Sequence, residues 1–315
     1  MEPKVAKLGH VAYRTPDLEE TAWFFEELMG LQAAERTEDA VYLRGLRDWE
    51  HHTMSLRAGG EAGVEHVAFR TEEPEHVEAF GTRFEGQGLD VEWLDPGRRP
   101  RGRRVGARRR PGRSPVPVLL RRREARGPQG SSLPPAQPSV QPGGREPRRL
   151  SAHRPRPRAR RRWRPLADWF TDELDFRTNE RFQSEDGSFW GWWLSRTALP
   201  HDIGIHKNED GPSFHHVSYH VDHLRDLWDA ADICREHGIA PDGGPGKHAI
   251  TNADFFYVIE PASGIRIELF AGPGYLNFEP DWEPIDWQPD DIGTELDHQW
   301  IGTQYSEDSI PYVER

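Results

Sequence analysis

The sequence predicts an α+β fold made of tandem βαβββ units, in which paired units share a curled mixed sheet and an Arg-rich irregular segment interrupts the series. The first observation is a repeat: residues 64–69 (VEHVAF) return as residues 214–219 (FHHVSY), which places His66 and His216 150 positions apart. The second is periodicity, because apolar residues recur at helical spacing over 16–31 and 224–234. One unit cannot bury its own sheet face, so paired units should curl around a shared cavity.

The predicted elements follow the order strand, helix and about three strands. Residues 8–13 (LGHVAY) alternate as a strand does before the first helix, and the helical segment 23–31 is echoed loosely by residues 168–176. Further strands are expected in the short apolar segments 40–43, 53–56, 190–194, 254–259 and 265–270. The sequence therefore predicts four such units in two pairs.

Residues 98–164 differ in composition from the rest of the chain. They hold 23 Arg and two acidic residues, which leaves 18 basic and 51 acidic residues elsewhere among the chain's 41 and 53. Three interpretations compete: a basic segment that binds nucleic acid through its arginines, a linker too poor in apolar residues to order, and an out-of-frame translation of a GC-rich gene, which we favour. On the third interpretation the segment replaces the last strands of the first half and the first strand of the second.

Two strands of the second half place a histidine and a carboxylate on inward faces. His216 shares a strand face with Phe214 and Ser218, and Glu268 shares one with Arg266 and Phe270. Two imidazoles and one carboxylate are the ligands that hold Fe(II) on one face and leave the other face open. Shifting His10 by the repeat distance of 145–150 predicts a third ligand near 155–160, where the nearest histidine is His153.

Composition limits the class of protein. Outside the Arg-rich segment the chain is acidic and poor in lysine, which is typical of proteins adapted to high salt. The lone cysteine, Cys234, excludes a disulfide framework and favours a reducing cytoplasm. No apolar run approaches membrane-spanning length, and the first residues do not begin as a signal peptide does.

Five short motifs give the chain a family resemblance. They are residues 41–46 (VYLRGL), 199–202 (LPHD), 215–218 (HHVS), 244–248 (GPGKH) and 257–268 (YVIEPASGIRIE). In this order the chain resembles the two-domain extradiol ring-cleavage dioxygenases of the vicinal-oxygen-chelate (glyoxalase/bleomycin-resistance) superfamily, such as catechol 2,3-dioxygenase and homoprotocatechuate 2,3-dioxygenase. The resemblance covers residues 6–96 and 165–300.

The resemblance implies roles for individual residues. His216 and Glu268 would be iron ligands, with His153 in the place of the third, while His201 would be an acid–base residue outside the ligand set. A role in holding substrate or intermediate oxygens would fall to His248 and Tyr257, and Trp193 would form a pocket wall. Plain alternatives remain: His201 could be an exposed strand end, Tyr257 core packing, and the Trp190–Trp193 run a filled sheet face. His10 and His66 would be structural residues of a half without iron.

The resemblance implies a non-haem Fe(II) dioxygenase that opens a catechol with O2 next to its diol, in the breakdown of aromatic compounds and as a homo-oligomer. Gly243 stands where homoprotocatechuate enzymes have an arginine, which favours an uncharged catechol. A glyoxalase-like lyase or isomerase, an inactive relic and a nucleic-acid-binding protein are the alternatives. We expect residues 6–97 to be a structural pair of units, 98–164 irregular, 165–272 the metal-binding pair, and 273–315 an acidic, Trp-containing extension.

Overall fold

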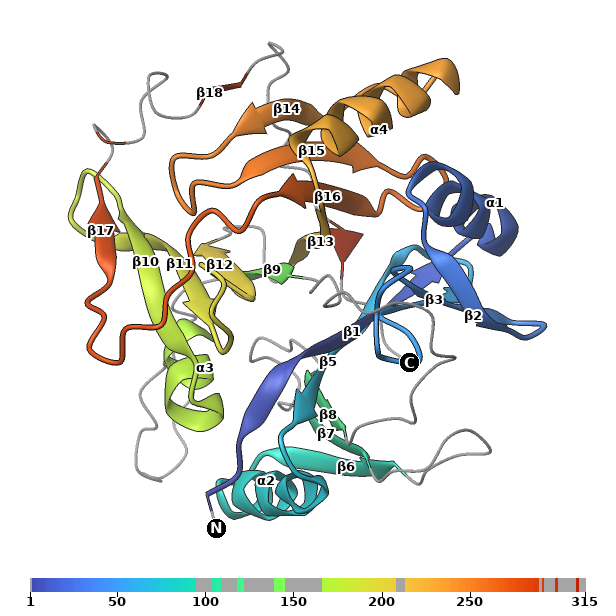
Figure 1. Cartoon of the computed structure of the whole chain (residues 1–315). Coiled ribbons are helices and arrows are strands. Elements are labelled where there is room, and N and C mark those ends of the chain that lie inside the picture. The colour runs from blue at the N-terminus through green and yellow to red at the C-terminus, as the bar shows by residue number, and fades with distance from the viewer. Residues whose placement is uncertain are drawn as a thin grey trace, which may run out of the picture.

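The structure is a computed structural model of the 315-residue chain. It describes residues 2–94, 104–108, 118–121, 139–144, 166–207, 213–288, 291, 298–299 and 310–311. These residues form two large mixed sheets with helices on their outer faces (Figure 1). The α+β class predicted from the sequence is confirmed.

Four βαβββ units follow one another along the chain. The first comprises β1 (Val5–Thr15), α1 (Leu18–Trp23), the π-helical turn η1 (Phe24–Leu28), β2 (Gln32–Arg36), β3 (Ala40–Arg44) and β4 (Met54–Ala58). The second comprises β5 (Gly63–Thr71), α2 (Pro74–Gly86), β6 (Asp90–Leu94), β7 (Arg104–Arg108) and β8 (Val118–Arg121). The third comprises β9 (Ser139–Gly144), α3 (Leu166–Leu174), β10 (Arg177–Gln183), β11 (Phe189–Ser195) and β12 (Ile203–Lys207). The fourth comprises β13 (Ser213–Val221), α4 (Leu224–Glu236), β14 (Gly243–Lys247), β15 (Asp254–Ile259) and β16 (Arg266–Ala271).

The two sheets repeat one topology. The first has the strand order β2-β3-β4-β1-β5-β8-β7-β6, and the second contains β10-β11-β12-β9-β13-β16-β15-β14 in the corresponding order. In each sheet the first strands of the two units pair antiparallel at the centre, β1 with β5 and β9 with β13. Each half is therefore a pair of units related by its own internal repeat, as the sequence predicts.

Three strands lie in the Arg-rich segment, where little regular structure was expected. β7 and β8 complete the first sheet through pairing of β8 with β5, and β9 lies between β12 and β13 in the second. The expectation is wrong for these strands. Short runs such as Val118–Leu120 contain β-forming residues, and these pair with a strand of the sheet. The remaining residues of 98–164, His153 among them, lie outside the described residues.

Central strands are buried on both faces, which explains their sequences. β16 is buried along its whole length, and β1 and β5 are buried at nearly every position. Helices cover these sheets, α4 over β13–β16 and α2 at the opposite end of the molecule (Figure 1). Helix α1 begins at its cap Asp17, whose side chain accepts a hydrogen bond from the Glu20 N–H.

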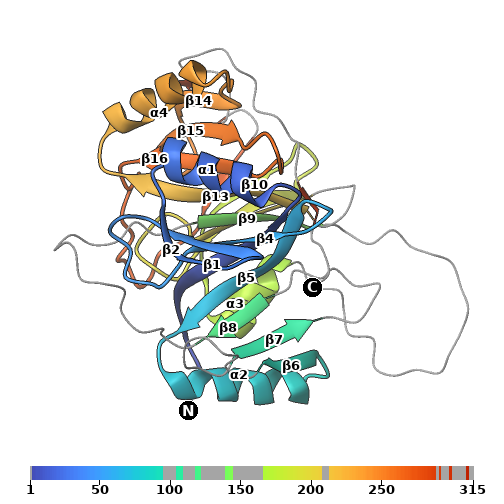
Figure 2. The same cartoon turned by 90° about the vertical axis from the view of Figure 1, so that its right-hand side faces the viewer.

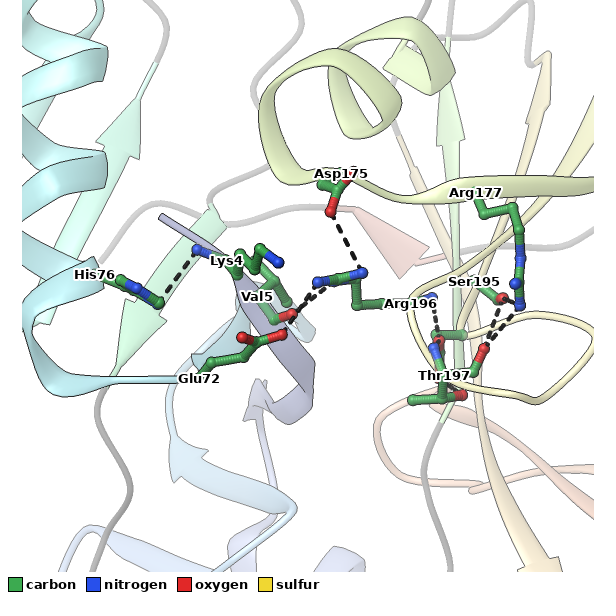
Figure 3. A network of polar contacts seen from close by, with 10 residues as sticks. Lys4, Val5, Glu72, His76, Asp175, Arg177, Ser195, Arg196 and Thr197 are labelled. Carbon is green, nitrogen blue, oxygen red and sulfur yellow. Dashed lines mark hydrogen bonds and ion pairs between the residues drawn. The ribbon is translucent and has the colours of Figure 1, made fainter. Parts of the chain in front are cut away.

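The two halves contact one another closely, and α1 of the first half lies beside the β13–β16 region of the second (Figure 2). The Thr21 hydroxyl donates to Glu260 across this contact at 3.1 Å. At a second contact Arg196 donates to the Val5 carbonyl at 2.7 Å and to Glu72 at 3.1 Å, and pairs with Asp175 at 3.4 Å (Figure 3). The loop after β11 is thus tied to the first half.

The C-terminal extension adds strands to the second sheet. β17 (Ile285–Trp287) pairs with β10, β18 (His298–Gln299) with β14, and β19 (Ile310–Pro311) with β13. The indole of Trp287 and the hydroxyl of Tyr275 both donate to the buried Glu180 of β10. Within the described part of the chain, the helices are too short or too polar to cross a membrane.

Candidate active site

Two parallel neighbours, β13 and β16, place a histidine beside a glutamate. Ser218 lies opposite Glu268 in their register, and His216 is two residues before Ser218, so the three side chains point to the same side. His216 is fully buried and Glu268 is 5% exposed. The Ser218 hydroxyl donates to the Glu268 Oε2, which fixes the orientation of the carboxylate.

The imidazole of His216 and the carboxylate of Glu268 converge. His216 Nε2 lies 3.2 Å from Glu268 Oε2, yet this nitrogen has no aligned hydrogen-bond partner among the described residues. Burial lowers the pKa of His216, so the imidazole is neutral at pH 7. Burial alone would raise the pKa of Glu268, but its contacts with His216 and His248 hold it well below its usual range. A neutral imidazole and a charged carboxylate are the forms that bind metal.

His248 and Tyr257 reach the same carboxylate from the neighbouring strands. Tyr257, on β15, lies opposite Glu268 in the register, and His248 follows β14. The Tyr257 hydroxyl and His248 Nε2 are 3.0 Å apart, and His248 Nε2 is 3.5 Å from Glu268 Oε1. The His248 ring stacks on Phe255 with centroids 3.9 Å apart, which limits its rotation.

His201 is held by the buried carboxylate next to it in sequence. Asp202 accepts hydrogen bonds from the backbone N–H groups of Arg196 and Thr197 and from the Thr197 hydroxyl. These bonds fix the loop between β11 and β12. His201 is half-buried with its Nε2 atom fully buried, and this desolvation lowers its pKa to about 4 although Glu268 opposes the shift. The alternative of an exposed strand end is therefore wrong.

A pocket opens beside His201 and Glu268. Its lining residues are Leu199, Pro200, His201, Thr251, Ala253, Glu268, Phe270 and Pro273. A mostly apolar wall with an imidazole and a carboxylate is suited to a small ring that carries polar substituents. Trp193 is buried on β11, and it is not one of the lining residues that the structure describes for this pocket.

Sequence reasoning missed His206, a half-buried histidine on β12 whose Nε2 atom is buried. Its ring stacks on Trp190 with centroids 4.6 Å apart and lies 5.1 Å from that of Trp193. Burial, with the nearby His216 and His201, lowers its pKa to about 3. The alternation of residues on this short strand, where His206 follows Gly204 by two positions, could have indicated it. His206 lies outside the motifs of the family resemblance.

The candidate ligands match in kind, but not in number, those needed by the metal that the resemblance implies. Buried imidazole nitrogens without partners and a charged carboxylate fit a divalent transition metal in kind. They do not fit in number, because the described residues contain no group of three or more His, Cys, Asp or Glu side chains placed to hold one ion. His216 and Glu268 are two donors, and the predicted third, His153, lies outside the described residues.

In the first half, His10 and His66 contact each other. Their Nε2 atoms are 3.0 Å apart, and the His10 ring also lies 4.4 Å from that of His52. All three rings are buried. The hydrogen bond between the two Nε2 atoms gives each of these nitrogens a partner without any ligand, in keeping with a structural role.

Known proteins are similar to this chain in sequence and in fold. A manganese-dependent 2,3-dihydroxybiphenyl 1,2-dioxygenase from Geobacillus genomosp. 3 is 38% identical and covers 96% of both chains. A metapyrocatechase from Geobacillus stearothermophilus is 31% identical over 96% of this chain and 91% of its own. Homoprotocatechuate 2,3-dioxygenase from Brevibacterium fuscum has a similar structure, with a TM-score of 0.82, 20% identity and coverage of 99% and 95%.

The family model of the Glyoxalase/Bleomycin resistance protein/Dioxygenase superfamily matches residues 7–130 and 164–269. These ranges contain most of the four βαβββ units but not β9, and they contain all the candidate site residues except His153. The resemblance to two-domain extradiol dioxygenases is thereby confirmed. The chain belongs to the Glyoxalase/Bleomycin resistance protein/Dioxygenase superfamily and has the two-domain architecture of its extradiol ring-cleavage dioxygenases.

Proposed function

We propose that the protein is a metal-dependent extradiol dioxygenase that opens the ring of a catechol with O2. The observation that supports this most is the convergence of His201, His216, His248, Tyr257 and Glu268 on one buried group beside a small pocket. Relatives named as dioxygenases at 38% identity over nearly the whole chain support the same activity.

His201 is proposed as the proton acceptor for a catechol hydroxyl. Its imidazole lines the pocket and is neutral at pH 7, so it has a free electron pair for the proton. Asp202 serves as its positioning residue, because the carboxylate fixes the loop that carries His201.

His248 and Tyr257 are proposed to orient the substrate's oxygens. The 3.0 Å hydrogen bond between them holds both groups beside Glu268, and the stacking of His248 on Phe255 keeps that ring in place. Trp193 is proposed to act indirectly, by packing against His206 rather than by lining the pocket.

The metal is proposed to be Fe(II) or Mn(II). Imidazole and carboxylate donors suit both ions, and one relative is named as manganese-dependent. His216 and Glu268 are the proposed ligands in the described part of the chain. The proposed substrate is catechol itself or a catechol with an uncharged substituent. We also expect the protein to form a homo-oligomer.

Oxygen uptake tests the proposed function directly. The purified full chain, with Fe(II) or Mn(II) added in excess, should consume one O2 per catechol or 2,3-dihydroxybiphenyl and form a yellow ring-opened product. Glu268→Gln should abolish both signals. Turnover of substrate without oxygen would instead favour a glyoxalase-like lyase or isomerase. Absence of oxygen uptake by protein shown to have metal bound would contradict the proposal.

A further inference from the structure

We propose that position 139, at the start of β9, is the third-ligand position of the metal centre, and that Ser139 leaves the centre with two protein ligands. The chain then binds divalent metal weakly, and a histidine at position 139 completes the site. The inference rests on the proposed function only in taking His216 and Glu268 as ligands. It is argued from the register of the two sheets.

In the first half, the register of β1 and β5 shows which residues lie opposite one another. In the antiparallel pair of β1 and β5, His10 lies opposite Ala68 and Ala12 lies opposite His66. A β-bulge follows at once, because Tyr13 pairs with Val64. The bulge fixes the register, since a slip by one residue would turn both histidines to the other face.

The second half has the same register and the same bulge. In the pair of β9 and β13, Ser139 lies opposite Ser218 and Gln141 lies opposite His216. The bulge recurs at the corresponding step, where Pro142 pairs with Phe214. Since β5 and β13 are related by a shift of 150, β1 and β9 are related by a shift of 129, which makes Ser139 the equivalent of His10.

The neighbouring parallel strands give the remaining equivalent position. β5 pairs with β8 so that Ala68 lies opposite Leu119, and β13 pairs with β16 so that Ser218 lies opposite Glu268. Three equivalent positions therefore surround one point in each sheet. They hold His10, His66 and Leu119 in the first half, and Ser139, His216 and Glu268 in the second.

A serine at this position cannot replace an imidazole. Its neutral hydroxyl is a weak donor to a first-row transition metal, whereas histidine nitrogen is among the strongest that proteins offer. The described residues give no other third donor within one group. The buried Nε2 of His206 has no hydrogen-bond partner among those residues, but the His206 ring is stacked on Trp190 rather than grouped with His216 and Glu268.

Metal titration of the full chain tests the inference without turnover. Mn(II) binding is measured by electron paramagnetic resonance of the free ion and by calorimetry, for the unmodified protein and for Ser139→His. The variant should bind one Mn(II) more than about 100-fold more tightly, because a whole ligand exceeds the 10–100-fold effect of an outer-shell contact. Ser139→Asn, which adds no strong donor, should bind as the unmodified chain does.

A second pair of variants guards against local misfolding. Ser139→Asp offers a carboxylate from a smaller side chain and should also tighten binding, and Ser139→His combined with His216→Ala should lose the gain. Circular dichroism establishes that each variant folds. Tight stoichiometric binding by the unmodified chain that disappears in His153→Ala or His206→Ala would overturn the inference. So would a folded Ser139→His and Ser139→Asp pair with unchanged affinity.

The two proposals fail in different ways. Metal-loaded Ser139→His protein that takes up no oxygen with either catechol would contradict the proposed function and leave the ligand position standing. Unchanged metal affinity in that variant, with oxygen uptake by the unmodified chain, would contradict the ligand position and leave the proposed function standing.

Discussion

The two halves of the chain build the same three-position frame and fill it differently. In the first half His10 and His66 hydrogen-bond to each other at 3.0 Å, and the carboxylate position belongs to Leu119. In the second half His216 and Glu268 lie 3.2 Å apart, and the imidazole nitrogen is buried without an aligned partner among the described residues. The first half pairs its two histidines with each other, and the second half brings an imidazole and a carboxylate together beside a pocket.

This difference shows how one fold yields a scaffold and a site. Burying a polar group without a partner costs about 1–3 kcal/mol. In the first half, the Nε2 atoms of His10 and His66 avoid that cost by pairing with each other. In the second half, the buried Nε2 atoms of His201, His206 and His216 have no aligned hydrogen-bond partner among the described residues.

The largest predicted effect compares equivalent histidines. His216→Ala should abolish Mn(II) or Fe(II) binding and oxygen uptake, because one of two ligands in the described chain is lost. His66→Ala, at the equivalent position of the first half, should leave metal binding unchanged and lower the free energy of unfolding by about 1–3 kcal/mol, since His10 loses its partner. Equal loss of metal in both variants would end the distinction between the halves.

His201→Asn should slow turnover without releasing metal. Removal of a positioned proton acceptor typically lowers kcat by about 10²–10⁴-fold. Because His201 is not one of the proposed ligands, the Mn(II) affinity should stay within the error of the measurement. Parallel metal titration and steady-state kinetics check this, and a loss of metal in His201→Asn would reassign that side chain as a ligand.

Asp202→Ala should act through the position of His201. The carboxylate accepts two backbone N–H groups and one hydroxyl, so its removal leaves buried donors without partners and should cost about 2–4 kcal/mol in urea unfolding. Asp202→Asn keeps one acceptor oxygen and should recover part of both stability and kcat. Full activity in the alanine variant would contradict the positioning role.

Arg196→Ala should give the smallest of these effects, at the contact between the halves shown in Figure 3. Loss of its bond to the Val5 carbonyl and of two ion pairs should lower the free energy of unfolding by about 1–2 kcal/mol. Arg225→Ala is the matched control, because Arg225 forms an exposed ion pair with Asp229 on one helix and should change stability by less than about 0.5 kcal/mol. Equal effects would mean that the contact adds nothing.

Much of the fold could be predicted because the repeated segments form buried strands. Residues 64–69 and 214–219 lie on central strands β5 and β13, where burial on both faces limits the choice of residues. The strands in the Arg-rich segment could not be predicted, since they are defined by pairing rather than by their own composition. β7 pairs with β6 and β8, β8 also pairs with β5, and β9 pairs with β12 and β13. Val118 pairs with Val67, 51 residues earlier in the chain, and Ser139 pairs with Ser218, 79 residues later.

The site was predictable where motif and geometry coincide. His201, His216, His248, Tyr257 and Glu268 all lie on the second sheet or its loops, and the structure brings them together. The third position was not predictable, because a constant shift of 145–150 placed it at 155–160 while the sheet register places it at Ser139. Insertions between strands change spacing along the chain but not the register across a sheet.

Anomalous diffraction at the manganese edge, from crystals of the full chain soaked in Mn(II), tests the central claim most directly. A peak bonded to His216 Nε2 and to the Glu268 carboxylate, with none near His10 and His66, is the predicted result. A peak in the first half, or one in the second half that contacts neither His216 nor Glu268, would contradict the assignment of these two residues as the metal-binding pair.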